Sequence, residues 1–185
     1  MPVAGNRPVV LIGMMGSGKS AVGRAYAAMK GLDFVDADQL IVDRHGAITE
    51  IFASRGEEYF RKIEAQVIAE AVGAADRTVV VSLGGGAVLH AATQRVLRNC
   101  CVVYLDADLQ TVLPRIIGDA ARPLLAGDPA VRWSGLHAER HALYERLADI
   151  ILQTGGQSIG NLAEVLAQRL EITTTNNEGT TANGK

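Results

Sequence analysis

Apolar and polar positions alternate along this chain in a way that predicts an α/β fold. The short apolar runs expected to form strands are Val9–Ile12, Phe34–Val35, Thr78–Ser82, Val102–Leu105 and Ile150–Leu152. The segments expected to form helices are Lys19–Met29, Asp38–His45, Glu57–Val72, Ala91–Leu97, Leu109–Ile116, Leu136–Leu147 and Ile159–Leu170. Because strands that are apolar along their length are typically covered on both faces, we expect a mainly parallel sheet between two layers of helices.

Two segments interrupt this alternation, and a polar tail follows it. Residues 38–64 hold more helical material than a simple crossover needs, so we expect an inserted platform for a small molecule. Residues 117–130 are rich in Gly, Ala, Asp and Pro, which predicts a mobile loop or lid. Residues 173–185 are mostly Thr, Asn and Gly, and we expect them to be disordered. Residues 1–172 then form a single domain.

Composition excludes several classes of partner. The 185 residues are 48% hydrophobic and only 4% aromatic, and the formal net charge is -2, so we expect neither a nucleic-acid nor a membrane surface. No apolar stretch reaches the roughly 20 residues that a membrane helix requires. The two cysteines, Cys100 and Cys101, are adjacent and cannot join distant parts of a fold. We therefore expect a reduced, cytoplasmic protein, and its size is compatible with a monomer.

The segment Gly13-Met14-Met15-Gly16-Ser17-Gly18-Lys19-Ser20 matches the phosphate-binding pattern G-x-x-x-x-G-K-[ST]. It follows an expected strand and opens an expected helix, which is the context that this motif requires. We expect Lys19 to reach the β- and γ-phosphates of a nucleotide and Ser20 to hold Mg²⁺. The predicted ATP-binding residues here are Gly16, Ser17, Gly18, Lys19, Ser20 and Ala21. The motif does not identify the acceptor, but the base-reading Asn-Lys-x-Asp pattern of GTPases is absent from the sequence.

Two carboxylates, Asp36 and Asp38, follow the second expected strand. Ligands of open parallel sheets bind at this end of the strands, so one carboxylate could serve the metal through water and the other a polyol substrate. Alternatively, Asp38 could simply cap the helix that follows. Asp106, at the end of a later apolar run, competes for the metal, and we rank Asp36 above it.

Together with four further stretches, these motifs resemble the shikimate kinase family. The stretches are Gly56-Glu57-Glu58-Tyr59-Phe60-Arg61-Lys62-Ile63-Glu64, Ser82-Leu83-Gly84-Gly85-Gly86-Ala87, Arg122-Pro123-Leu124-Leu125 and Arg140-His141-Ala142-Leu143-Tyr144. The resemblance implies a P-loop NTPase of the nucleoside-monophosphate-kinase-like fold, with a five-stranded parallel sheet, a substrate-binding insert and a lid. It implies transfer of the γ-phosphoryl group of ATP to the 3-hydroxyl of shikimate, a step of aromatic amino acid biosynthesis.

The resemblance also assigns roles on the substrate side. Asp38 would hold the ring hydroxyls beside the attacking oxygen, Arg61 and Arg140 would bind the carboxylate, and Gly84, Gly85 and Gly86 would let the backbone approach the substrate. A planar guanidinium suits this task because it can grip a carboxylate with two parallel hydrogen bonds. The commoner fate of a helical arginine is an ion pair on its own helix, here with Glu57, Glu58 or Glu64 for Arg61, and with Glu139 or Glu145 for Arg140.

On the nucleotide side, the resemblance places Arg122 over the phosphates when the lid closes and Arg115 near the adenine. The sequence departs from the family pattern at Gln157, where an arginine is usual near the adenine, and at Ala142, where proline is usual. We expect Gln157 to change nucleotide binding and Ala142 to loosen the placement of Arg140. The catalytic residues are then predicted to be Asp38, Lys19 and Arg122, with Ser20 and Asp36 at the metal.

Two rival functions and one further motif remain. Gluconate kinase shares the fold and the phosphate loop, and a catalytically idle nucleotide-binding module would need only the loop. His137 and His141 are one helical turn apart and could bind a metal, but no third ligand has suitable spacing, so we expect solvated histidines.

Overall fold

The computed structural model describes residues 7–73, 78–117 and 128–180. Its centre is a five-stranded sheet of β1 (Val9–Ile12), β2 (Asp33–Asp36), β3 (Val79–Ser82), β4 (Cys101–Asp106) and β5 (Ile150–Gln153). All neighbouring strands are parallel, in the order β2-β3-β1-β4-β5. The five-stranded parallel sheet is therefore confirmed. Because β1 is the central strand, the loop that follows it lies in the middle of the edge where all five strands end.

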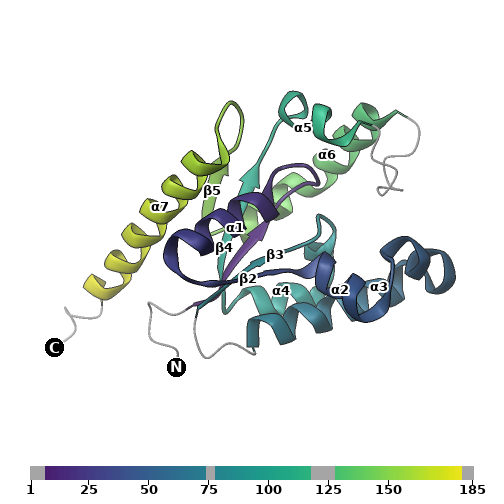
Figure 1. Ribbon diagram of the computed structural model, residues 1–185, viewed down its shortest axis with the longest axis horizontal. Helices are drawn as coiled ribbons and strands as arrows, with labels where there is room; N and C mark the ends of the chain where they lie inside the picture. The colour runs from purple at the N-terminus through teal and green to yellow at the C-terminus, as the bar shows by residue number, and fades with distance from the viewer. Residues whose placement is uncertain (1–6, 74–77, 118–127, 181–185) are drawn as a thin grey trace.

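Helices cover both faces of the sheet (Figure 1). The first face carries α1 (Lys19–Lys30) and α7 (Ile159–Thr180), and the second carries α3 (Ile48–Gly73), α4 (Ala91–Leu97), α5 (Leu109–Ile116) and α6 (Pro129–Leu147). Successive side chains of β1 pack on opposite faces, Val9 and Leu11 in the core under α1 and α7, and Val10 and Ile12 in the core under α3 to α6. Because side chains alternate between the two faces and every residue of the strand is apolar, β1 contributes to both cores and is buried on both sides.

The segment expected as an insert contains α2 (Ala37–His45) and most of α3. The chain breaks its helical conformation at Gly56, whose φ of 79° favours glycine, so the expected helix from Glu57 starts directly after a real bend. Ile41, Ile51, Phe60 and Val67 form a separate small core here, and α2 and the N-terminal part of α3 extend away from the main sheet (Figure 1).

Two helices are longer than expected. α6 begins at Pro129 instead of Leu136, because Asp128 accepts hydrogen bonds from the backbone N–H groups of Ala130 and Val131 and Pro129 takes the first helical position. The end of the segment expected as a lid is therefore helical, while residues 118–127 lie outside the described residues.

α7 continues to Thr180, into the segment for which we expected disorder, and residues 181–185 lie outside the described residues. α7 is anchored on the sheet by Leu162, Ala163 and Leu166, and extending a helix that is already formed needs no second nucleation step.

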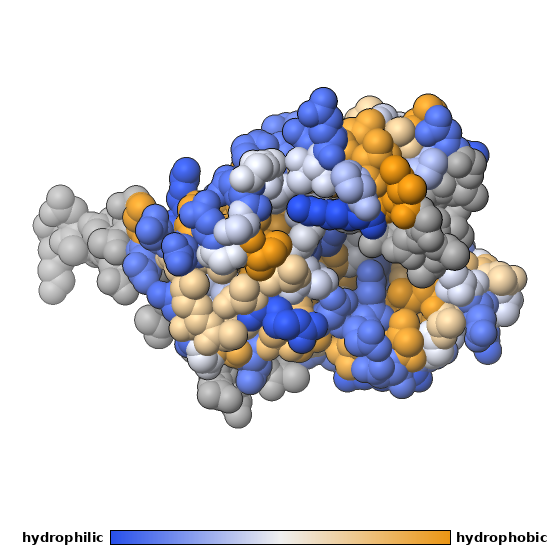
Figure 2. All heavy atoms as spheres, turned by 45° about the horizontal axis from the view of Figure 1, so that its top comes forward, coloured by the Kyte–Doolittle hydropathy of each residue, from blue (hydrophilic) through white to orange (hydrophobic). Residues whose placement is uncertain are grey.

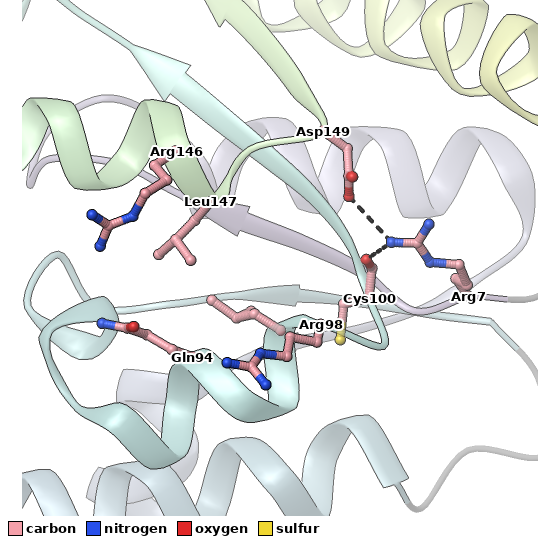
Figure 3. Close-up of a pocket in the computed structure, with 8 residues that line it drawn as sticks. Arg7, Gln94, Arg98, Cys100, Arg146, Leu147 and Asp149 are labelled. Carbon is pink, nitrogen blue, oxygen red and sulfur yellow. Dashed lines mark hydrogen bonds and ion pairs between the residues drawn. The ribbon is translucent and has the colours of Figure 1, made fainter.

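The carboxyl ends of the strands come forward in the space-filling view, which shows a hollow bordered by hydrophilic and hydrophobic side chains (Figure 2). At the opposite end of the sheet lies a cavity of about 300 Å³ (Figure 3). Arg7, Arg98 and Arg146 are among its lining residues, and none of the predicted site residues lines it. Both cysteines are free thiols in buried positions, and no described helix has the length and apolar character needed to cross a bilayer.

Candidate active site

The phosphate loop bends back on itself between β1 and α1. Gly13, Gly16 and Gly18 have φ values of 138°, 80° and 96°, all in the region that favours glycine. A Cβ on Gly13 would lie 2.5 Å from the carbonyl oxygen of Leu105, so the loop also needs glycine to pass β4. Lys19 is buried across the loop, with its Nζ donating to the carbonyl oxygen of Met14 at 2.8 Å.

The first turn of α1 is open to an anion. Gly18 supplies no capping side chain, and the turn contains no acidic residue. The backbone N–H groups of this turn and the positive end of the helix dipole therefore point to the place where a phosphate would bind. Ser17 is 1% exposed, and its Oγ has no hydrogen-bond partner within the described part of the chain.

A cluster of oxygen donors lies beside Lys19. The Oγ of Ser20 donates to Asp36 Oδ2 at 2.5 Å and lies 3.2 Å from the Oγ of Ser82. Hydroxyl and carboxylate oxygens are the donors that Mg²⁺ prefers. The two residues predicted to serve the metal, Ser20 and Asp36, are thus in direct contact, and their donor atoms fit this ion.

Asp38 does not cap the helix that follows the acidic pair. Asp36 is the N-cap of α2, and its Oδ1 accepts from the backbone N–H groups of Asp38 and Gln39 at 3.1 and 3.3 Å. The side chain of Asp38 is therefore available for another task. Burial first, and the nearby charge of Asp36 second, raise the pKa of the Asp38 carboxyl above its usual range, and Lys19 and Arg61 oppose this only partly.

Arg61 is held on α3 by two glutamates. Its Nη1 donates to Glu64 Oε2 at 2.7 Å and its Nη2 to Glu57 Oε1 at 3.2 Å, whereas Glu58 pairs with Lys62. Burial lowers the pKa of Arg61, but Glu64 and Glu57 outweigh this, and the net shift is upward. The ion pairs that we expected as the alternative to carboxylate binding therefore form with Glu57 and Glu64. Arg61 is nevertheless only 8% exposed, so it is not a solvated surface arginine.

Glu64 is the carboxylate that orients Arg61. It is 1% exposed, and burial raises its pKa to about 7 against the opposing effect of Arg61. Its Oε1 has no hydrogen-bond partner within the described residues.

Arg140 is buried and forms no ion pair with the residues that the structure describes, although its guanidinium interacts with the side chain of Tyr144. It is 5% exposed, and its Nε and Nη1 find no hydrogen-bond partner in the part of the chain that the structure describes. The expected alternative of a solvated pair with Glu139 or Glu145 is therefore wrong, since Glu145 instead faces His141, with Glu145 Oε1 and His141 Nε2 3.3 Å apart. A buried guanidinium with unpaired N–H groups is poised to bind an anion.

Three glycines bring these parts together, and each meets a different neighbour. A Cβ on Gly84 would lie 2.6 Å from Asp38 Oδ1, and a Cβ on Gly86 would overlap the Arg61 guanidinium. Gly85 packs against the phosphate loop, and its carbonyl oxygen accepts from the hydroxyl of Tyr144, one turn after Arg140 on α6, at 2.5 Å. The glycine run therefore adjoins Asp38, Arg61 and the helix that carries Arg140.

Of the two residues predicted near the adenine, Arg115 contacts the phosphate loop and Gln157 lies just before α7. Arg115 Nη1 donates to the carbonyl oxygen of Gly16 at 2.9 Å. Gln157, before α7, donates to the carbonyl oxygen of Gln153 at 2.9 Å and accepts from Asn161. Ala142 lies inside the continuous helix α6, so Arg140 does not depend on a proline-bearing turn. Arg122 lies outside the described residues.

Two contributors were not singled out from the sequence. Ser82 ends β3 beside Ser20, and the signal for it was its place directly before the glycine run. Tyr144 carries its hydroxyl to Gly85, and burial raises its pKa to about 12. The Leu-Tyr pair marked its motif, but only the packing of α6 on the sheet shows what the hydroxyl contacts.

A phosphate loop, a metal-compatible oxygen cluster and two buried arginines at the end of a parallel sheet define a P-loop kinase of small molecules. The family model described as shikimate kinase matches residues 15–171. The chain is 41% identical over 167 residues to a shikimate kinase of Thermobifida fusca, covering 89% of this chain and 96% of that protein. The chain therefore belongs to the shikimate kinase family, and it is an enzyme, a kinase; the family's reaction is the ATP-dependent phosphorylation of shikimate in aromatic amino acid biosynthesis.

Solved structures agree with this assignment. A shikimate kinase from Acinetobacter baumannii in complex with shikimate superposes with a TM-score of 0.84 at 32% identity, covering 89% of this chain and 93% of that chain. A gluconokinase from Sinorhizobium meliloti superposes with a TM-score of 0.64 at 18% identity, covering 95% and 97% of the two chains. The second likeness shows a shared fold alone, so gluconate kinase remains a rival only in architecture.

Proposed function

We propose that this enzyme transfers the γ-phosphoryl group of ATP to the 3-hydroxyl of shikimate, giving shikimate 3-phosphate and ADP. The observation that carries the proposal is the pair of buried arginines beside the phosphate loop, Arg61 and Arg140, of which Arg140 has Nε and Nη1 unpaired within the described residues. A phosphate loop alone binds nucleotides of many enzymes. A buried guanidinium whose Nε and Nη1 have no partner among the described residues favours an anionic acceptor, and the carboxylate of shikimate supplies that charge.

The phosphate loop and the oxygen cluster support the nucleotide side of the reaction. The N–H groups of the loop and Lys19 would hold the transferring phosphates. Ser20 and Asp36 would hold Mg²⁺, which when bound offsets negative charge on the phosphoryl oxygens. Arg122 would close over the phosphates, while Arg115 and Gln157 would border the adenine.

Asp38 is suited to orient the acceptor hydroxyl and to take its proton late in the transfer. Its side chain lies against Gly84, close to Asp36, and it does not cap α2. Its raised pKa makes the ionised carboxylate a stronger proton acceptor. Glu64 would act through Arg61, by fixing the guanidinium that meets the substrate carboxylate.

The decisive experiment measures ADP production with ATP and Mg²⁺, with shikimate, with gluconate and without an acceptor. We expect rapid turnover only with shikimate, and equal rates with and without shikimate would refute the proposal. Asp38→Asn should lower kcat at least about 100-fold, since general base catalysis contributes on this scale. Asp43→Asn is the matched control, because Asp43 is an exposed aspartate of the same helix that contacts only Gln39 among the contacts described. Near-full turnover by Asp38→Asn would disprove its role.

We also propose that the enzyme works as a monomer in the cytoplasm. Two buried free thiols support a reducing compartment. A sedimentation experiment at micromolar concentration would show a single species of about 19.6 kDa.

A further inference from the structure

Three side chains with metal-binding chemistry meet on the far side of the phosphate loop from α1. They are Asp106, at the end of β4, and His137 and His141 of α6, and their ligand atoms all lie within 4.8 Å of one another. Asp106 Oδ1 lies 3.8 Å from His137 Nε2 and 4.0 Å from His141 Nδ1. The sequence showed the histidine pair but no third ligand, because Asp106 reaches it only through the packing of α6 on β4.

The polar atoms of this cluster are not all paired within the described residues. Glu145 Oε1 lies 3.3 Å from His141 Nε2 and favours a proton on that nitrogen, which leaves the lone pair of Nδ1 facing Asp106. His137 Nε2 is buried and has no hydrogen-bond partner within the described residues. The hydroxyl of Tyr104 lies 2.8 Å from Asp106 Oδ1 and 3.1 Å from His141 Nδ1, but it has one proton to give. Such a convergence of acceptors calls for a cation.

The surroundings already hold the ligands as a metal site requires. Gln153 Nε2 donates to the second oxygen of Asp106 at 2.8 Å, and Glu145 orients His141. The ring of His137 stacks on Trp133, with centroids 4.9 Å apart and an angle of 11° between the planes. Outer contacts of this kind fix the orientation of metal ligands in known sites. Ligand atoms around a tetrahedral zinc are about 3.3 Å apart, given metal–ligand bonds of roughly 2.0–2.1 Å. Side-chain rotations that move each ligand atom by less than about 1 Å would therefore bring the three atoms to these distances.

We propose that Asp106, His137 and His141 bind a divalent transition metal ion of the Zn²⁺ class. Two imidazoles and one carboxylate suit Zn²⁺, Co²⁺ or Ni²⁺ and not Mg²⁺, which prefers oxygen ligands alone. The ion would join α6 to β4 next to the active site. His137 lies one turn before Arg140, and Trp133 Nε1 donates to the carbonyl oxygen of Met15 in the phosphate loop at 3.1 Å. The site is distinct from the predicted Mg²⁺ cluster of Ser20 and Asp36.

The test uses the full chain without a polyhistidine tag. Zn²⁺ is titrated in competition with a chromophoric chelator at pH 7.5, with 5 mM Mg²⁺ present throughout. We expect one ion per chain. His137→Gln, His141→Gln and Asp106→Asn should each weaken binding at least about tenfold, because even changes to outer contacts of metal sites cost 10–100-fold. His45→Gln is the matched control, since this exposed histidine of α2 lies outside the cluster, and it should bind as tightly as the wild type.

A second measurement needs no variant of the cluster. The X-ray absorption spectrum of the zinc-loaded protein should show two imidazoles bound to the ion. Equal affinity in the wild type and in His137→Gln, or a spectrum with fewer than two imidazoles, would overturn the proposal. The proposal would also be overturned if the chelator competition detected no Zn²⁺ binding at micromolar concentrations. A proton shared between the side chains would then satisfy the cluster. Loss of kinase activity plays no part in this test, so its outcome is separate from that of the proposed function.

Discussion

Arg140→Met separates substrate recognition from protein stability. In the free protein Arg140 is 5% exposed, and its Nε and Nη1 have no partner within the described residues. We propose that the carboxylate of shikimate provides that partner. Methionine fills a similar volume without the charge, so the substitution removes the interaction with the acid while keeping the packing of α6.

The size of the effect follows from the number of hydrogen bonds lost. A hydrogen bond to a charged group contributes about 1.5–3 kcal/mol, which corresponds to roughly 10- to 150-fold in kcat/KM. The substituted enzyme should lose this factor with shikimate but very little with the methyl ester of shikimate, whose carboxyl group is uncharged. Steady-state rates with both compounds give the coupling between the side chain and the carboxylate directly.

Stability should move in the opposite direction. A buried charge without a partner destabilises the folded protein, so Arg140→Met should melt at the same temperature as the wild type or higher. A gain of 1 kcal/mol would appear as about 2–4 °C in a protein of this size. Arg146→Met is the matched control, because Arg146 is an exposed arginine near the end of the same helix, beside the cavity at the far end of the sheet.

One result would refute this reasoning. If Arg140→Met lowered kcat/KM equally for shikimate and for its methyl ester, Arg140 would not read the carboxylate. A lower melting temperature accompanying that result would mean that the guanidinium is paired in the free protein, and its burial would then be structural.

Two further predictions concern the residues that support Arg61 and Asp38. Gly84→Ala would place a Cβ 2.6 Å from Asp38 Oδ1, so it should lower kcat/KM for shikimate at least about tenfold. Gly135→Ala is the control, because nothing lies within 4 Å of its Cβ, and it should stabilise α6 by about 0.5–1 kcal/mol without a kinetic change. Equal kinetics in both variants would contradict the steric argument. The pKa of Glu64 is raised to about 7 in the folded protein, so the folded protein binds this proton more tightly than the unfolded chain does. The stability that this proton contributes is complete below the unfolded pKa of about 4.5 and is lost as the pH rises to about 7. The free energy of unfolding should therefore fall across this window in the wild type relative to Glu64→Gln, and parallel pH profiles from denaturant titrations would show that Glu64 titrates normally.

The phosphate loop could be predicted from the sequence because its physics is local. Positive φ at Gly16 and Gly18 requires glycine at those positions, and Lys19 follows in a fixed register after β1. The same holds for the strands, of which β1, β3 and β4 are buried along nearly their whole length, and all five differ from the expected ranges by a residue or two. The insert also showed itself locally, since Gly56 marks the bend after which the helix resumes.

Other features depend on contacts between segments that are distant in the sequence. Asp36 and Asp38 looked alike in the chain, and only the backbone geometry at the start of α2 decides that Asp36 is the cap. Arg61 and Arg140 had the same ordinary alternative, a solvated helical ion pair. The structure separates them, because Arg61 keeps its ion pairs with Glu57 and Glu64, whereas Arg140 has no glutamate partner among the described residues. The start of α6 has a local signal, because Asp128 is a typical N-cap residue and Pro129 a typical first helical residue.

The glycine run shows why the site works as one unit. Three consecutive glycines of one loop adjoin Asp38, the phosphate loop and Arg61, and any side chain at Gly84 or Gly86 would occupy space that Asp38 or Arg61 already fills. Tyr144 fastens the middle glycine to the helix of Arg140 through a hydrogen bond of 2.5 Å. A movement of α6 therefore shifts the loop and Arg140 together. If Asp38 and the arginines bind the acceptor as we propose, the acceptor is held in a fixed position relative to the phosphate loop, because both are bounded by the same three glycines.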